Sequence, residues 1–89
     1  MDEQQLLRFL INLTPRQREV LSRVCHGLMN GEIAQELYIE SCVVAEHLTN
    51  IYAEAVNALY PAAPRINRYV LIRLCAPVFD RHPELTAPA

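Results

Sequence analysis

Apolar residues in the middle of the chain predict two short amphipathic helices joined by a tight turn. In each helix they recur at intervals of three and four residues, which places them on one face. They are Ile33, Ala34 and Leu37 within residues 30–37, and Val44, Leu48, Ile51 and Ala55 within residues 41–57. With the turn at residues 38–40, these segments predict a helix-turn-helix, whose second helix is buried along one face and presented outward along the other.

A capping motif predicts a longer helix before this pair. Thr14 suits the N-cap position, Pro15 suits the first helical position, and Gln17 completes a capping box with Thr14. The helix should therefore begin at Pro15, and Gly27 is the residue type that commonly ends a helix. Its expected buried residues are Val20, Leu21, Val24 and Leu28.

The other helix starts are marked by weaker signals. Residues 2–11 predict a leading helix, and Asn30 and Ser41 are the expected N-caps of the helix-turn-helix, because both side chains can accept a backbone N–H. The expected inner side of the leading helix carries Leu6, Leu7, Leu10 and Ile11.

The last helix is expected from Pro64 to Ala76. Pro61 and Pro64 separate it from the preceding helix, and Pro77 should end it, because proline lacks an N–H and does not fit a helix interior. The tail from His82, with Pro83 and Pro88, is expected to fray.

This last helix is apolar on two sides. One side carries Ile66, Val70 and Leu74, and the other carries Leu71, Ile72 and Cys75. A small domain can cover only one side, so the other is expected to meet a second copy or an obligate partner. The expected contact residues are Tyr69, Leu71, Ile72 and Cys75.

Together these elements predict an all-α fold, a four- or five-helix bundle that contains the helix-turn-helix. Residues 1–89 are expected to form a single domain. Residues 12–60 would be its helix-turn-helix core, and residues 61–80 its C-terminal dimer or partner helix.

Composition narrows the classes of function. The 89 residues contain no lysine and carry a formal net charge of −2, whereas a freestanding nucleic-acid-binding domain usually has a basic excess. Three cysteines without C-x-x-C spacing predict reduced thiols, with neither a disulfide framework nor a metal site. Cys25 and His26 are helix neighbours that point about 100° apart, so no enzyme and no cofactor are expected.

The absence of a signal peptide and of a membrane-spanning run predicts a cytoplasmic protein with no membrane partner.

Three motifs resemble the LuxR/GerE-type helix-turn-helix domain of bacterial transcription regulators. They are L-T-P-R-Q-R-E-V-L (13–21), N-x-E-I-A-x-x-L-x-I (30–39) and V-x-x-H-L-x-N-I-Y (44–52), and the resemblance covers about residues 12–56. It implies a domain of four helices, in which the third lies in the DNA major groove and the fourth helps to form a dimer.

The chain departs from this family at the positions that would touch DNA. Where the family usually has lysine, serine, threonine, lysine and a basic pair, this sequence has Gly31, Glu40, Val43, Ala45, and Ala53 with Glu54. Phosphate contacts supply most of the non-specific affinity for DNA, so their loss predicts weak or non-standard binding.

The outward face of residues 41–57 is therefore expected to be small, apolar and acidic. It could be an idle surface, a protein-binding face with a charge-depleted centre, or a DNA contact that uses Thr49 and Asn50 with arginines from elsewhere. Its residues are Cys42, Val43, Ala45, Glu46, Thr49, Asn50 and Ala53. Arg16, Arg65 and Arg68 are candidate phosphate contacts, although the arginines of the helix from Pro15 are expected to form solvated pairs with Glu19 and its neighbours.

The sequence thus predicts a freestanding small bacterial transcription regulator that forms a homodimer and binds DNA weakly or by non-standard contacts. The alternative is an interaction module that has lost DNA binding and acts through a protein of the transcription machinery, such as another regulator or RNA polymerase.

Overall fold

Five α-helices and one short 3-10 helix make up the computed structural model, which describes residues 2–86. No strand is present in that part of the chain, so the predicted all-α class is confirmed. In chain order the elements are α1 (Glu3–Asn12), α2 (Pro15–Cys25), α3 (Asn30–Leu37), α4 (Ser41–Leu59), α5 (Arg68–Arg81) and η1 (Pro83–Leu85).

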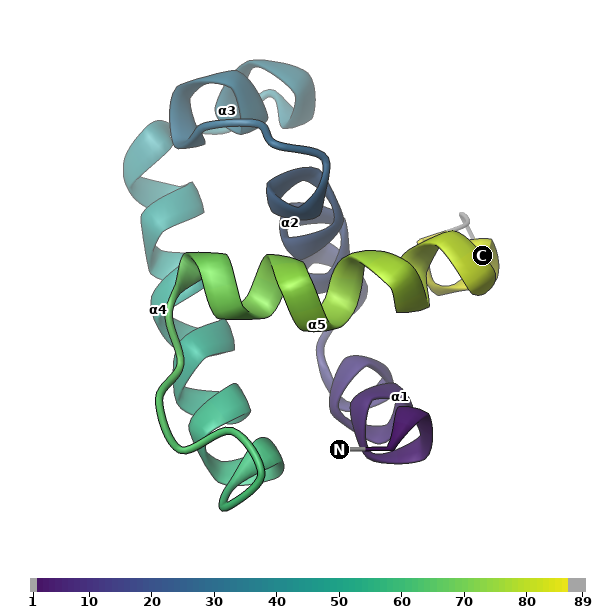
Figure 1. Cartoon of the computed structure of the whole chain (residues 1–89). Helices are drawn as coiled ribbons and strands as arrows, with labels where there is room; N and C mark the ends of the chain where they lie inside the picture. The colour runs from purple at the N-terminus through teal and green to yellow at the C-terminus, as the bar shows by residue number, and fades with distance from the viewer. Residues whose placement is uncertain (1, 87–89) are drawn as a thin grey trace.

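The helices are arranged around the inner side of α4. Figure 1 shows α4 along one side of the molecule, α3 near its start, and α5 crossing in front of α2. Both α1 and α2 pack against α4 and against α5, whereas α3 packs mainly against α4. One side of α4 is therefore closed by the rest of the domain, and its opposite side is left to solvent.

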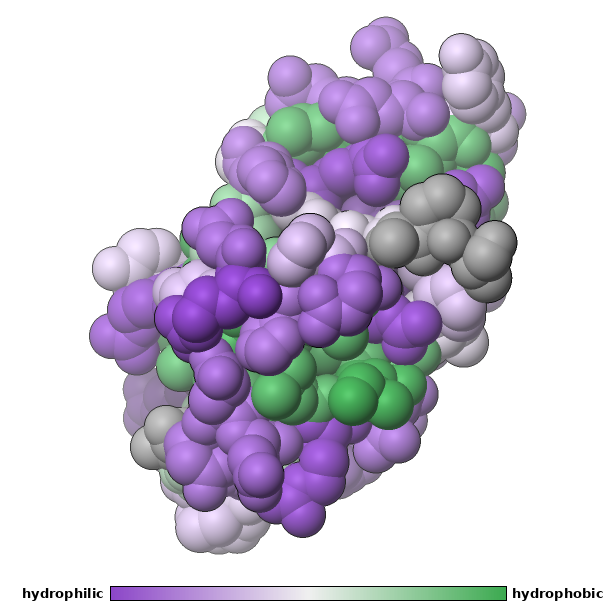
Figure 2. Space-filling view, turned by 90° about the vertical axis from the view of Figure 1, so that its right-hand side faces the viewer, coloured by the Kyte–Doolittle hydropathy of each residue, from purple (hydrophilic) through white to green (hydrophobic). Residues whose placement is uncertain are grey.

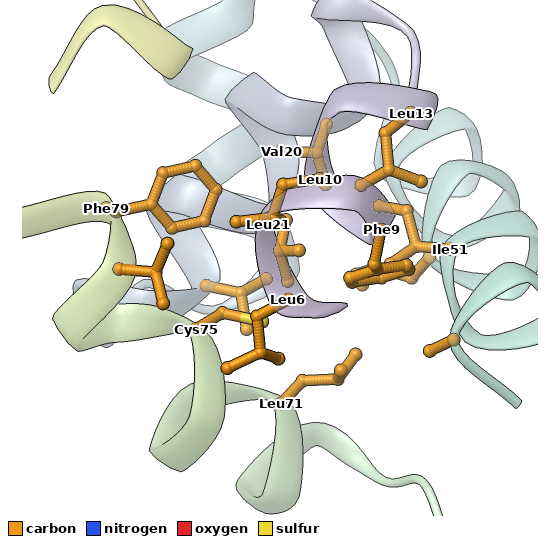
Figure 3. Packing of buried hydrophobic residues seen from close by; sticks show 14 of the residues in the cluster. Leu6, Phe9, Leu10, Leu13, Val20, Leu21, Ile51, Leu71, Cys75 and Phe79 are labelled. Carbon is orange, nitrogen blue, oxygen red and sulfur yellow. The ribbon is translucent and has the colours of Figure 1, made fainter. Parts of the chain in front are cut away.

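A single apolar core joins these helices. Leu10, Leu21, Ile51 and Leu71, which come from four different helices, are fully buried within it, as Figure 3 shows. Because the core draws on α1 and α5 as well as on the helix-turn-helix, all five helices depend on one another for burial of their apolar faces.

The start of α2 follows the predicted capping box. The Thr14 hydroxyl accepts the backbone N–H of Gln17 at 3.1 Å, and the Gln17 side chain accepts the backbone N–H of Thr14 at 2.9 Å. After the helix, Gly27 has φ of +88°, a left-handed conformation that suits glycine.

Both helices of the helix-turn-helix have N-caps one residue earlier than predicted. Met29 and Glu40 occupy these positions, so Asn30 and Ser41 are the first helical residues and their prediction as N-caps is wrong. At the start of α3 the Glu32 carboxylate accepts the backbone N–H of Met29 at 2.8 Å. The Asn30 side chain is engaged elsewhere, as described below.

Pro77 lies inside α5, although it was predicted to end this helix. A proline in a helix interior costs about 3 kcal/mol. Continuing the helix to Arg81 buries Val78 and Phe79, which are 1% and 6% exposed, and each such side chain contributes roughly 1.5–3 kcal/mol. Burial therefore offsets the cost of the proline.

The start of α5 also differs from the prediction. The helix begins at Arg68 rather than at Pro64, because Asn67 caps it by accepting the backbone N–H of Val70 at 2.9 Å.

Part of the predicted contact surface of α5 is wrong, because two of its four residues are buried in the core. Leu71 and Cys75 are fully buried with Val78 and Phe79, so they are not available as an outward contact surface. Tyr69, in contrast, is 70% exposed, and Ile72 is half-buried. The four buried residues of α5, Leu71, Cys75, Val78 and Phe79, are spaced so that they lie on one face of the helix. Burial of Val78 and Phe79 makes this face the inner one.

The inner side of α1 differs in a similar way. Leu6, Phe9 and Leu10 are buried, whereas Leu7 is half-buried and Ile11 is 61% exposed. The side of α1 that faces the core is therefore the one that carries the large Phe9 ring, and Ile11 lies outside it. Figure 2 shows an apolar patch, bordered by hydrophilic side chains, on the side of the molecule where α1 lies.

The segment after α5 is folded where fraying was predicted. Residues 83–85 form η1, and the Leu85 carbonyl accepts a hydrogen bond from Arg18. Pro88 lies outside the described residues.

Candidate macromolecular interface on α4

The exposed side of α4 is presented by the turn that precedes it. Tyr38 ends α3 in a left-handed conformation, with φ of 57°, and is 95% exposed. The chain then enters α4, whose inner face is anchored by five buried residues. These are Val44, Leu48, Ile51, Ala55 and Leu59.

All but one of the residues predicted for the outward face are exposed in the structure. The exception is Val43, which is half-buried at the edge of the face. The exposed residues are Cys42, Ala45, Glu46, Thr49, Asn50 and Ala53. The structure therefore brings this predicted set together on one helix.

The chemistry of this face is acidic and otherwise weakly polar. Glu40, Glu46 and Glu54 are exposed, and none of them has a side-chain hydrogen bond or an ion pair within residues 2–86. The Thr49 hydroxyl donates to the Ala45 carbonyl at 3.0 Å, so its proton is already used inside the helix. Between residues 24 and 64 the sequence holds five glutamates and no arginine or lysine.

Several arginines that could have met phosphate are engaged inside the chain. Arg18 is not the solvated ion-pair partner that was predicted. Its Nη1 donates to the carbonyls of Leu10 and Ile11 at 3.2 Å each and of Leu13 at 2.7 Å. Its Nε donates to the Leu85 carbonyl at 2.8 Å. Arg18 thus satisfies the C-terminal carbonyls of α1 and fastens η1 to α2.

The other two arginines of α2 form the expected ion pairs and an additional contact. Arg16 pairs with Glu19 at 2.8 Å, and its Nη2 donates to the Leu37 carbonyl at the end of α3, at 3.4 Å. Arg23 pairs with Glu36 of α3 at 2.9 Å. Both contacts to α3 help to fix the first helix of the helix-turn-helix on α2.

Two arginines of α5 are also engaged. Arg68 donates to the Leu28 carbonyl at 2.7 Å and to the Asn30 side chain at 2.8 Å, which joins the start of α5 to the start of α3. Arg81 pairs with Glu3, and this guanidinium holds the pKa of the Glu3 carboxyl below its ordinary value.

These contacts separate the arginines into two groups. Arg16 and Arg68, two of the three candidate phosphate contacts, are used within the fold, and their role toward DNA stays a prediction. Within residues 2–86, Arg8, Arg65 and Arg73 have no intramolecular hydrogen bond or ion pair. Sequence reasoning missed the carbonyl contacts of Arg18 and Arg68, because a carbonyl acceptor leaves no signal in the residue type.

We expect Arg18→Met to lower the free energy of unfolding by about 2–3 kcal/mol, because it leaves the part-buried carbonyls of Leu13 and Leu85 without this donor. Urea denaturation measures this change. Arg8→Met is the matched control, since Arg8 is exposed on α1 and should change stability by less than about 0.5 kcal/mol. Equal effects of the two substitutions would contradict the role assigned to Arg18.

Two of the three cysteines, Cys25 and Cys75, have thiols whose pKa lies well above the ordinary value. Burial, together with the nearby Asp80 carboxylate, raises the pKa of the Cys25 thiol to about 12. Burial also raises the pKa of the Cys75 thiol to about 12. Both thiols are therefore protonated at neutral pH, which makes them poor nucleophiles. No group of three metal-ligating side chains is found among the described residues.

None of the helices formed by residues 2–86 combines the length and the apolar character needed to cross a membrane.

Comparison with known proteins gives matches to the central part of the chain. The family described as "Bacterial regulatory proteins, luxR family" matches residues 11–54. Transcriptional regulatory protein LnrK of Bacillus subtilis (strain 168) is 44% identical over 45 residues, which are 51% of this chain and 20% of LnrK. A protein of Mycobacterium tuberculosis (strain ATCC 25618 / H37Rv) that carries the name HTH-type transcriptional regulator Rv0890c is 42% identical over 43 residues, which are 48% of this chain and 5% of that protein.

The chain therefore spans a fifth or less of the length of these relatives. No solved structure matches it. The matched segment begins at the end of α1 and includes α2, α3 and most of α4, whereas α5 lies outside it.

Proposed function

We propose that this chain, in which residues 11–54 form a helix-turn-helix domain of the LuxR family, controls transcription through a macromolecule that meets the outer face of α4. The observation that carries this proposal is the position of α4, which is anchored along one face and exposed along the other, directly after α3 and a tight turn. A helix presented in this way is the part of a helix-turn-helix that contacts a partner. Its place of action would be the bacterial cytoplasm, where the DNA is.

DNA is the first candidate partner, with weak or non-standard contacts. A helix in the major groove lies between two phosphate backbones, and cations near it supply much of the affinity. The exposed side chains of α4 include Glu46 and Glu54 and no cation. Any phosphate contact would thus have to come from arginines outside α4, among which Arg65 has no hydrogen bond or ion pair to another residue of the described range 2–86.

A protein of the transcription machinery is the second candidate. It is favoured by the small side chains Cys42, Ala45 and Ala53 on the exposed face, with glutamates beside them. Small residues let another helix approach closely, and a charge-depleted centre is typical of protein interfaces. The carboxylates favour a basic partner such as the DNA-binding surface of another regulator.

A gel-shift titration with duplex DNA at several salt concentrations tests the first candidate against the second. We expect binding only at low salt, with a log–log salt slope of about −1 to −3, because few cations can reach phosphate. A working DNA reader that makes 6–10 phosphate contacts would show a slope of roughly −5 to −9. Tight binding at physiological salt with such a slope would show that the acidic α4 face does not weaken DNA contact.

A further inference from the structure

The connection before α5 and the first three turns of α5 carry cations without any nearby carboxylate in the sequence. Residues 64–79 contain three arginines and no aspartate or glutamate. Arg68 is used internally, but Arg65 and Arg73 are exposed and have no intramolecular partner within residues 2–86. Both line one hollow of about 390 Å³, whose other lining residues are Ala62, Ala63, Pro64, Val70 and Leu74. The hollow thus combines an apolar floor with two free guanidinium groups.

Three exposed apolar or aromatic side chains lie on the elements next to this hollow. Val56 at the end of α4 is 46% exposed, Tyr60 in the connection is 65% exposed, and Tyr69 at the start of α5 is 70% exposed. Tyrosine and arginine are among the residue types enriched at protein interfaces. The combination indicates a surface that binds protein and favours an acidic partner with apolar side chains.

A symmetric contact of this surface with itself is disfavoured by its charge. In a two-fold pairing in which this hollow meets the hollow of a second copy, four arginines, Arg65 and Arg73 of each copy, are brought into one interface. Like charges brought together at an interface cost several kcal/mol. A contact of this hollow with itself therefore brings like charges together, whereas a contact with an acidic surface does not.

The chain itself carries the complementary surface on α4. Glu46 and Glu54 are exposed and have no cationic partner within residues 2–86, and they are separated by about 12 Å along the helix, at 1.5 Å per residue. Ala53 and Cys42, both exposed and small, lie on the same side of the helix as Glu46 and provide apolar area there. The α4 face thus offers the acidic and apolar character that the hollow between the connection and α5 favours.

We propose that a second copy of this chain docks its acidic α4 face, centred on Glu46 and Glu54, against the hollow that holds Arg65 and Arg73. Because each copy carries both surfaces, each could offer its α4 face to the hollow of the other, and two such contacts would close a dimer. Self-association would then cover the α4 face. The inference rests on the proposed function in one respect, namely that a transcription partner must reach the outer face of α4. Because the dimer would cover this face, dimerisation would compete with that partner.

Charge exchange tests this docking directly. The acidic variant R65E/R73E and the basic variant E46R/E54R should each associate at least about 100-fold more weakly than the wild type, as measured by sedimentation equilibrium at low salt. An equimolar mixture of the two variants should recover association to within roughly tenfold of the wild type, because every contact in the mixed dimer again joins opposite charges. Association of the wild type should also weaken as sodium chloride is raised.

Arg8→Glu is the matched control, because Arg8 is also exposed and unpaired within residues 2–86 but lies on α1. It should leave association unchanged. Thermal unfolding of each variant verifies that the exchanged surfaces still belong to a folded domain. A wild type that is monomeric at millimolar concentration, or a mixture of variants that stays monomeric, would overturn the docking.

The association assay contains neither DNA nor a transcription partner. A monomeric wild type would therefore remove the self-docking and leave the proposed role of α4 in transcription intact. Conversely, the gel-shift result changes the proposed function without changing the measured association.

Discussion

The combined substitution Val43→Thr, Ala45→Lys, Ala53→Arg and Glu54→Lys should raise the affinity for arbitrary duplex DNA by roughly two to three orders of magnitude at about 0.1 M salt. It places on α4 the residue types that the LuxR family usually has at these positions. Three of the four positions are exposed, and Val43 is half-buried at the edge of the face. The substitution therefore adds three cations and removes one carboxylate without disturbing the inner face of the helix.

The magnitude follows from counterion release. Each new phosphate contact adds about 0.9 to the log–log salt slope, which at 0.1 M corresponds to nearly a tenfold gain in affinity. Gel-shift titrations of the wild type and the variant across salt concentrations measure both the affinity and the slope. Stability should change by less than about 1 kcal/mol, because the changed side chains lie outside the core.

A charge-matched control separates a specific effect of α4 from a general effect of net charge. Gln4→Lys, Asn12→Arg and Asp80→Lys make the same change in formal charge at exposed positions of α1 and α5. We expect this control to gain much less affinity. If both variants gained equally, or if the wild type already bound tightly and the α4 variant no better, α4 would not be the DNA-contacting helix.

Leu48→Ala and Ile51→Ala should each lower the free energy of unfolding by about 2–5 kcal/mol. Leu48 is 4% exposed and Ile51 is fully buried, and both anchor α4 to the other helices. Truncation removes apolar contact and leaves a cavity that the close-packed core fills only in part. For a domain of this size, each kilocalorie lost corresponds to a fall in Tm of roughly 4–8 °C.

Calorimetry or urea denaturation measures these changes, and two exposed-side substitutions on the same helix calibrate them. Val43→Ala should cost less than about 1 kcal/mol, because Val43 is only half-buried, and Thr49→Ala should cost about 0.5 kcal/mol or less. A larger loss for Val43→Ala than for Ile51→Ala would mean that α4 is rotated relative to the structure described here.

Sequence alone was sufficient where the structural signal is local. The capping box at the start of α2 involves residues that are three apart, so its hydrogen bonds form with little influence from the rest of the chain. The inner face of α4 was also predictable, because Val44, Leu48 and Ile51 are large and apolar while most residues on the opposite side of the helix are small or polar. These two features are enough to identify the helix-turn-helix and its exposed face.

The tertiary structure decided the cases in which the sequence allowed more than one local solution. The last helix has apolar residues on two sides, and packing of Phe79 and Val78 against the core selected the side that includes Leu71 and Cys75. Asn30 could have capped α3, but its side chain accepts a hydrogen bond from Arg68, which is 38 residues away.

The acceptors of the arginine side chains also could not be predicted from the sequence. Arg16, Arg18 and Arg68 are equivalent cations in the sequence, and each could pair with a carboxylate, a phosphate or a carbonyl. Their acceptors include the Leu85 carbonyl, 67 residues from Arg18, and the Leu28 carbonyl, 40 residues from Arg68. Every residue has such a carbonyl, so only the folded arrangement of the helices determines which ones a guanidinium reaches, and hence which arginines stay free to meet a partner.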